Sequence, residues 1–195
     1  SATSTIVRRM LTIGGKSVDV FIKRSRQKRA WKRVLLGFRP SRAMRAFKLG
    51  HMLLTRRIAT ALPLAAIWRR VGPFLTDSIL IAEAVEAPQL QLAQEVLWQL
   101  GRMLQQLHDN QFVHRDLKAT NIRVRWEPGR RPEIVLVDLD GLSKVRFVTA
   151  RRNFRGLMRL NVSLLQCPAV NHAGQLRMLM GYLRRPGSGR INFKP

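Results

Sequence analysis

The run His114-Arg115-Asp116-Leu117-Lys118-Ala119-Thr120-Asn121 is the most informative stretch of this sequence. It brings a carboxylate, an ammonium group and a side-chain amide close together in a polar loop. The pattern before the run predicts a long amphipathic helix, and the pattern after it predicts a short pair of strands. Asp116, Asp138 and Asp140, three of the 11 acidic residues, lie within one 25-residue stretch. Because acidic residues are scarce in this chain, this grouping marks a candidate site.

The run has the composition that phosphoryl transfer from ATP requires. That reaction needs a carboxylate to accept the proton of the attacking hydroxyl, ligands for Mg²⁺ and positive charge at the transferred group. The run fits the kinase catalytic-loop pattern H-R-D-x-x-x-x-N residue for residue. We therefore expect Asp116 to be the catalytic base, Lys118 to neutralise the γ-phosphate and Asn121 to bind a metal ion. A basic turn with an ordinary aspartate is the weaker interpretation.

Two other segments supply the remaining parts of such a site. Val137-Asp138-Leu139-Asp140 ends an apolar strand 22 residues after Asp116, where kinases place an aspartate that chelates Mg²⁺. Asp138 takes that role. Upstream, Val20-Phe21-Ile22-Lys23 matches the strand V-A-I-K, so Lys23 is the predicted contact to the α- and β-phosphates. Glu83 ends a predicted strand that leads into the hinge between two expected lobes, and it is also assigned to nucleotide binding. ATP and Mg²⁺ are the expected cofactors.

The hydrophobic patterns predict an α+β chain. Because the run 114–121 resembles the kinase catalytic loop, that resemblance implies a protein-kinase-like, compact two-lobed fold, with a small, incomplete β-rich N-lobe at 1–86 and a helical C-lobe at 87–195. Pro63 is expected to interrupt the apolar run that follows the first helix. The predicted elements are a hairpin of Thr5–Ile13 and Val18–Lys23 around Gly14-Gly15, a helix from Ser41 to about Arg57, a strand at Ser78–Glu83, a helix from about Gln89 to Asp109, strands at Ile122–Arg125 and Ile134–Val137, and helices around Phe154–Leu160 and Leu176–Leu183.

Composition limits the class of protein and of partner. Hydrophobic residues make up 46% of the 195 residues, which is enough for one domain with a core or for two small lobes, and the four Trp and eight Phe argue against disorder. A single cysteine excludes an internal disulfide, and together with the lack of an apolar leader it favours the cytoplasm. The net charge is +25, from 36 Lys and Arg against 11 Asp and Glu. Such a surface attracts polyanions, which include nucleic acids, anionic lipid headgroups and phosphorylated saccharides.

Several further segments share one family pattern: Ser41–Phe47 with Arg57–Thr60 and Pro63–Ala65, Leu107-His108-Asp109, Val137–Asp140 in place of D-F-G, and Arg152–Asn161. With these segments, the layout resembles the bacterial lipopolysaccharide kinase (Kdo/WaaP) family more than it resembles eukaryotic-type protein kinases. The resemblance implies an ATP-dependent kinase whose acceptor is a hydroxyl of the lipopolysaccharide core or of a similar glycolipid. It also implies an anionic, lipid-linked saccharide as partner and peripheral contact with an anionic membrane, at the inner face of the cytoplasmic membrane.

Departures from the kinase pattern keep other functions open. No glycine-rich phosphate loop is present, and no acid lies near Ala46, where the helix Glu that pairs with the strand Lys should fall. A pseudokinase, or binding scaffold without turnover, is therefore one alternative. A serine/threonine protein kinase is another, although only 55 residues follow Asp140 and they contain no Ala-Pro-Glu. A nucleic-acid-binding domain rests on charge alone and has no specific motif.

Overall fold

The computed structural model describes residues 3–26, 40–72, 74–85, 94–147, 149–166 and 170–184. The chain divides into two compact units, Ser1–Val85 and Glu86–Pro195, and each is described by itself. The first unit contains four strands and helix α2, and the second contains three helices and two pairs of short strands, as counted over the described residues. The architecture is mixed α and β with antiparallel sheets, in agreement with the α+β class expected from the sequence.

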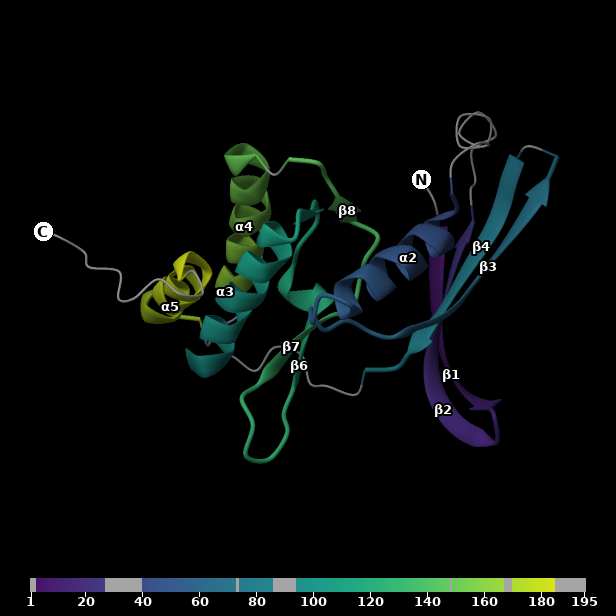
Figure 1. The fold of residues 1–195 in the computed structure, drawn as a ribbon, viewed down its shortest axis with the longest axis horizontal. Coiled ribbons are helices and arrows are strands. Elements are labelled where there is room, and N and C mark those ends of the chain that lie inside the picture. The colour runs from purple at the N-terminus through teal and green to yellow at the C-terminus, as the bar shows by residue number, and fades with distance from the viewer. Residues whose placement is uncertain are drawn as a thin grey trace, which may run out of the picture. The chain divides into compact units, whose positions relative to one another are not determined.

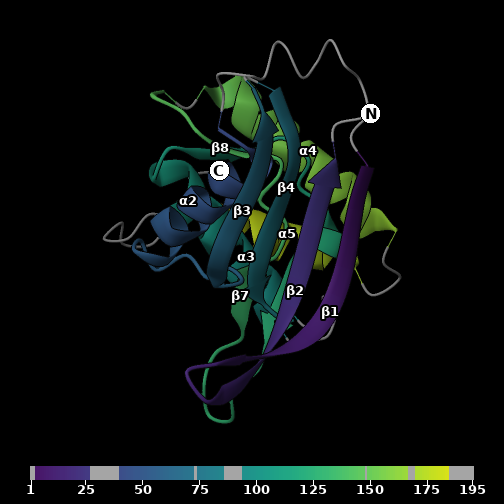
Figure 2. The same cartoon turned by 90° about the vertical axis from the view of Figure 1, so that its right-hand side faces the viewer.

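The first unit is built on an antiparallel sheet of β1 (Thr3–Ile13), β2 (Lys16–Arg26), β3 (Pro63–Val71) and β4 (Phe74–Glu83). Figure 2 shows their order, β1-β2-β4-β3. The predicted hairpin is confirmed: Gly14 and Gly15 have φ values of 56° and 78°, which suit a tight turn between twisted strands. Pro63 does not merely break an apolar run, as the sequence suggested. It is the first residue of β3, a position in an edge strand that tolerates proline.

Helix α2 (Arg42–Leu54) packs against β3 and β4. The predicted N-cap is confirmed, because Ser41 Oγ accepts a hydrogen bond of 3.0 Å from the backbone N–H of Met44. The helix ends at Leu54, before the predicted Arg57, which adopts a positive φ in the following turn. Ala46 belongs to the buried face of α2. Position 46, where the sequence lacked the expected glutamate, is therefore a core position in this unit.

Three helices form the larger part of the second unit: α3 (Gln94–Asp109), α4 (Ala150–Leu165) and α5 (His172–Leu183) (Figure 1). All three were predicted. Residues 89–93, which the sequence assigned to the start of α3, lie outside the described residues. The predicted apolar face of α3 is buried at Leu97, Leu100, Leu104 and Leu107. Helix α5 packs closely on α3, since a Cβ at Gly181 would lie 2.4 Å from the Trp98 carbonyl oxygen.

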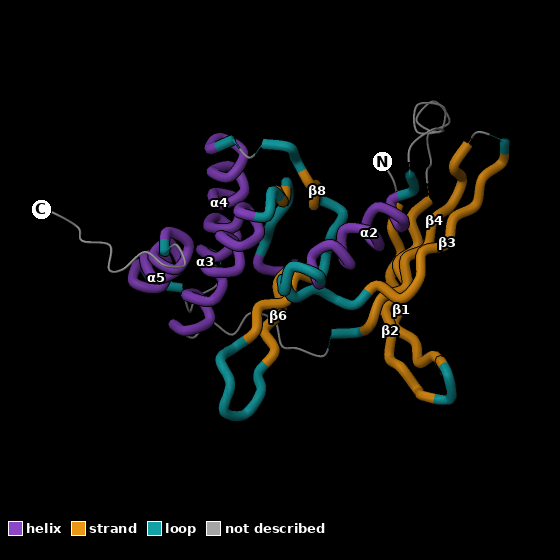
Figure 3. Tube along the Cα trace, viewed as in Figure 1, coloured by secondary structure: helices purple, strands orange, loops and turns teal. Residues whose placement is uncertain are grey.

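Two short antiparallel ladders place the candidate site within the second unit. Strand β5 (Phe112–His114) pairs with β8 (Leu142–Lys144), and β6 (Ile122–Arg125) pairs with β7 (Glu133–Leu136). A turn of 3-10 helix, η1 (Ala119–Asn121), precedes β6, and a long turn joins β6 to β7 (Figure 3). The sequence predicted β6 with the observed bounds and placed β7 one residue later than it lies. It did not predict β5 or β8. Together the ladders bring residues 115–121 next to residues 137–141.

No helix within the described ranges combines the length and the apolar character needed to cross a lipid bilayer.

Candidate active site

The loop that contains Asp116 is held at both ends by backbone hydrogen bonds to the segment that contains Asp138. At one end, the N–H of Arg115 donates to the carbonyl of Gly141 at 3.0 Å. At the other, the N–H of Val137 donates to the carbonyl of Asn121, also at 3.0 Å. Two segments that are distant in sequence therefore form one local structure. The candidate residues Asp116, Lys118, Asn121 and Asp138 all lie within it.

His114 joins the two segments from the inside. Its side chain is only 3% exposed, and Nε2 lies 2.8 Å from the carbonyl oxygen of Asp138. Burial lowers the pKa of His114, against the opposing effect of its hydrogen bond to Asp138 and of the nearby carboxylates. Because a carbonyl oxygen can only accept, the Nε2–H of His114 donates to Asp138. The close packing of Gly141 against this ring leaves no room for a side chain at position 141.

The side chains of Asp116 and Lys118 form an ion pair, with 3.1 Å between Lys118 Nζ and Asp116 Oδ2. Each side chain is about half exposed, so water or a substrate can reach both. Asn121 supports the same loop, because its Nδ2 donates to the main-chain carbonyl of Asp116 at 3.1 Å. A carboxylate, an ammonium group and an amide are thus positioned by one eight-residue loop. This arrangement can accept a proton from a hydroxyl and offer positive charge beside it.

The donors at Asn121 and Asp138 fit a magnesium ion. The Asn121 amide nitrogen is used within the loop, so the amide oxygen is the atom that could act as a ligand. Asp138 Oδ1 accepts a hydrogen bond of 3.1 Å from the N–H of Asp140, which fixes the orientation of the carboxylate. Mg²⁺ usually takes one or two protein oxygens and completes its shell with phosphates and water. Among the described residues, no group of three or more His, Cys, Asp or Glu is arranged to hold a metal ion.

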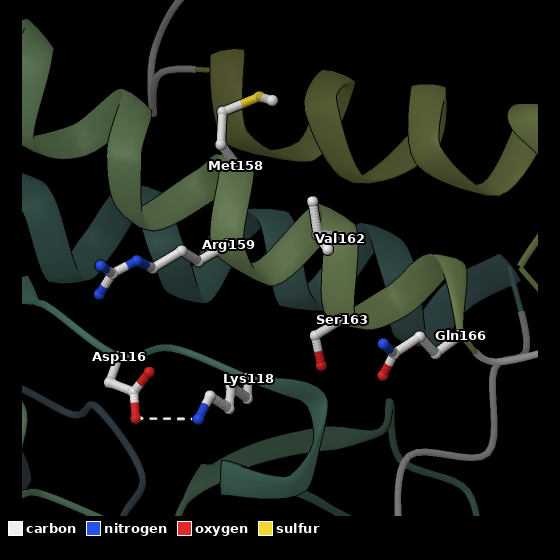
Figure 4. Close-up of a pocket in the computed structure, with 7 residues that line it drawn as sticks. All are labelled: Asp116, Lys118, Met158, Arg159, Val162, Ser163 and Gln166. Atoms are coloured by element: carbon white, nitrogen blue, oxygen red, sulfur yellow. Dashed lines mark ion pairs between the residues drawn. The ribbon is translucent and has the colours of Figure 1, made fainter.

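A pocket of about 400 Å³ opens beside the ion pair. Asp116 and Lys118 form one side of it, and residues of α4 form the other (Figure 4). Asp116 is the one acid among the lining residues, so the pocket is positively charged overall. The other lining residues are Met158, Arg159, Val162 and Ser163 of α4, and Gln166, which caps the end of that helix.

Helix α4 also supports the catalytic loop directly. The Arg159 guanidinium donates a hydrogen bond to the main-chain carbonyl of Arg115. Ser163 Oγ accepts one of 3.0 Å from the backbone N–H of Ala119. Sequence reasoning did not assign either residue to the site. Arg159 lies in the segment Arg152–Asn161 that carried the family resemblance, which could have identified it, whereas nothing in the sequence pattern indicated Ser163.

The two predicted nucleotide contacts lie in the first unit. Lys23 is half-buried in β2, an inner strand, opposite Leu80 of β4 and Ile6 of β1. Glu83 is the exposed last residue of β4, opposite Val20, and its N–H donates to the carbonyl of Leu62 at 2.9 Å. The two residues lie on neighbouring strands but not opposite each other. Their assignment to a nucleotide site stays a prediction.

Comparisons with known proteins agree with the sequence and with the fold. Residues 6–182 match the model of the lipopolysaccharide kinase (Kdo/WaaP) family. A solved structure described as WaaP in complex with acyl carrier protein is similar in fold, with a TM-score of 0.61. It shares 19% sequence identity over 92% of this chain and 76% of that chain. A search among curated proteins found no match. The resemblance inferred from the sequence is therefore confirmed, and the chain belongs to the lipopolysaccharide kinase (Kdo/WaaP) family, whose members are phosphotransferases with alcohol groups as acceptors.

Proposed function

We propose that this kinase transfers the γ-phosphoryl group of ATP to a sugar hydroxyl of the lipopolysaccharide core or of a similar glycolipid. The observation that carries the proposal is the pocket in which Asp116 and Lys118 face α4. A hydroxyl placed there lies next to a carboxylate that is exposed and held in a fixed loop. This is the arrangement that a kinase needs around its acceptor.

Asp116 is the proposed catalytic base. Its carboxylate orients the acceptor hydroxyl and accepts its proton while the acceptor oxygen bonds to the γ-phosphorus. The bond from the γ-phosphorus to the oxygen of ADP breaks, and ADP leaves. Lys118, 3.1 Å from the Asp116 carboxylate, provides positive charge where the transferred group passes between the two oxygens. The charge of the pocket suits an acceptor that already bears a phosphate or a carboxylate, which Arg159 could bind.

Asn121 and Asp138 are the proposed metal ligands, on the basis of the donor chemistry described above. Asn121 and Asp138 would hold Mg²⁺ beside the phosphates of ATP, where the ion would supply positive charge against the charge that develops during transfer. Lys23 and Glu83 are the proposed contacts to ATP from the first unit. We propose with this that residues 1–86 and 87–195 act as the N-lobe and the C-lobe of a protein-kinase-like fold. Because α2 contains no Asp or Glu, any acidic partner of Lys23 comes from elsewhere in the chain.

The proposed place of the reaction is the inner face of the cytoplasmic membrane. A lipid-linked sugar is presented at that surface, and ATP is available on the same side. The net charge of +25 favours contact with anionic lipid headgroups.

The test is transfer of radiolabelled phosphate from Mg-ATP to dephosphorylated lipopolysaccharide, compared for the wild type, Asp116→Asn and Asp138→Asn. Removal of a general base typically lowers kcat by about 10²–10⁴-fold. Glu133→Gln is a matched control, because it also replaces a carboxylate by an amide but in an exposed ion pair with Arg125. The control should keep wild-type activity.

The same assay decides between turnover and binding alone. The lack of an acidic residue in α2 favours a scaffold that binds ATP without transferring phosphate. If the wild type binds Mg-ATP but labels neither lipopolysaccharide, a protein acceptor nor a small alcohol, the scaffold interpretation is correct. If a protein substrate is labelled at serine or threonine in preference to lipopolysaccharide, the proposed acceptor is wrong.

A further inference from the structure

Helix α4 exposes a row of large apolar side chains. Phe154, Met158, Val162 and Leu165 are each 44–63% exposed, and their spacing of four, four and three residues places them on one face of the helix. We call these four residues the α4 stripe. The opposite face of α4 is buried at Gly156, Leu160 and Leu164. A helix packed on a core normally presents polar residues to water, so a second apolar face indicates a surface that becomes covered.

The charges around the stripe indicate what covers it. Residues 141–195 contain eleven Lys and Arg and no Asp or Glu. Arg155 and Arg159 of α4 are exposed, in the same turns of the helix as Phe154, Met158 and Val162. An apolar face with arginines beside it is the composition of a helix that lies in a membrane interface. Each Lys or Arg near an anionic leaflet contributes about 1 kcal/mol to binding.

A second copy of the chain fits the stripe poorly. Two stripes packed against each other would bring arginines together, and α4 and α5 contain no acid to pair with them. An anionic bilayer provides both an apolar layer for the stripe and phosphates for the arginines.

The stripe is continuous with the pocket that contains Asp116. Met158 and Val162 belong to the stripe and also line the pocket. In Figure 4 these two side chains point away from the catalytic loop, whereas Ser163 of the same helix and Gln166, which caps it, point toward the loop. A surface that covers the stripe therefore lies directly beside the opening of the pocket.

We propose that the α4 stripe is the docking face for an anionic lipid bilayer, and that docking brings the sugar of a membrane-embedded glycolipid to the pocket. The inference deepens the proposed function, since the delivery of an acceptor rests on it. The contact with lipid does not depend on turnover. Two separate measurements can therefore distinguish a failure of one proposal from a failure of the other.

The first measurement is sedimentation with vesicles, without ATP. The vesicles contain either phosphatidylcholine alone or roughly two parts phosphatidylcholine to one part phosphatidylglycerol. The test variant is Phe154→Gln/Leu165→Gln, which leaves the pocket-lining residues intact. The matched control is Ile6→Gln/Met10→Gln in β1, where both side chains are about 60% exposed. All four positions are exposed, so both variants should fold.

We expect the wild type to bind the anionic vesicles and the α4 variant to bind them at least tenfold more weakly. The β1 variant should bind within twofold of the wild type, and Asp116→Asn should bind as the wild type does. The inference is overturned if the wild type does not bind the anionic vesicles, or if the α4 variant binds them as well as the wild type. It is also overturned if the wild type self-associates in lipid-free solution and the α4 variant does not, because a second copy of the chain then covers the stripe.

The second measurement is phosphate transfer to lipopolysaccharide in vesicles and to its detergent-dispersed form. The α4 variant should lose activity on the embedded acceptor and keep it on the dispersed one. Equal loss on both contradicts the role of the stripe in delivery. The remaining outcome is that neither the wild type nor any variant transfers phosphate, although vesicle binding follows the expected pattern. In that case the proposed acceptor is wrong, and the assignment of the α4 stripe as a docking face is retained.

Discussion

A methyl group added at Gly141 tests whether the catalytic loop and the metal segment form one packed structure. In Gly141→Ala the new Cβ would lie 2.8 Å from His114 Cε1 and 3.2 Å from His114 Nδ1. The ring cannot move away freely, because it is buried and its Nε2 is bonded to the carbonyl of Asp138. The substitution therefore has to strain the loop, or displace the ring and break that hydrogen bond.

The cost follows from these contacts. Overpacking by one methyl group in a tight core typically costs about 1–3 kcal/mol. Loss of the buried hydrogen bond between His114 and Asp138 would add about 1 kcal/mol. An alanine at this position would also reduce the entropy of the unfolded chain, which returns about 0.4–1 kcal/mol. The expected net loss of stability is about 1–3 kcal/mol.

The assay is a double-mutant cycle with His114→Ala, in which unfolding by urea is followed by circular dichroism. His114→Ala is itself destabilising, but it removes the atoms that Gly141→Ala would meet. With a slope of about 1–3 kcal/mol per molar urea, Gly141→Ala should lower the wild-type midpoint by roughly 1 M. In the His114→Ala background the same change should cost less than about 0.5 kcal/mol. The reasoning is refuted if Gly141→Ala costs the same in both backgrounds.

Three further predictions concern the second unit. Burial lowers the pKa of His108 to about 4, below the unfolded value of 6.5, so its contribution to stability is complete above pH 6.5 and is lost as the pH falls toward 4. At 1.36 kcal/mol per pH unit, this loss is about 3 kcal/mol. The urea midpoint of the wild type should therefore fall more between pH 7 and pH 4.5 than the urea midpoint of His108→Gln does. Ser163→Ala leaves the buried N–H of Ala119 without its acceptor, and steady-state kinetics should show a lower kcat at nearly constant affinity for ATP. Gly181→Ala would place a Cβ 2.4 Å from the Trp98 carbonyl oxygen, and thermal unfolding should show a loss of more than about 1 kcal/mol; unchanged melting would contradict the close packing of α5 on α3.

The local features of the fold could be predicted from the sequence, and the reasons are physical. The N-cap at Ser41, the glycine turn before β2 and the leucine face of α3 are set by residues close together in the chain. Strands β5 and β8 could not be predicted, because each has only three residues and is stabilised by a partner about 30 residues away. Strand β3 was missed because Pro63 was taken as a break rather than as a first strand residue.

The candidate site could be predicted in part for the same reason. Asp116, Lys118 and Asn121 lie in one loop, and the hydrogen bond and ion pair between them are local in sequence. The hydrogen bond between Ala119 and Ser163 spans 44 residues, and no periodicity in α4 distinguishes a serine that supports a loop from one that faces water. The role of Arg159 likewise depends on the position of α4 beside the loop. Sequence patterns identified the chemistry, and tertiary contacts supplied the residues that position it.

The ladder of β6 and β7 has a consequence for how this site tolerates change. Asn121 comes directly before β6 and Asp138 follows β7, and the bond from Val137 to Asn121 closes the base of the hairpin. The separation of the two proposed metal ligands is therefore set at the base, and the exposed turn at 126–131 does not determine it. That turn can change in length or receive an inserted peptide while the ligands keep their spacing. It is a suitable position for an affinity tag or a fluorescent label in the kinase.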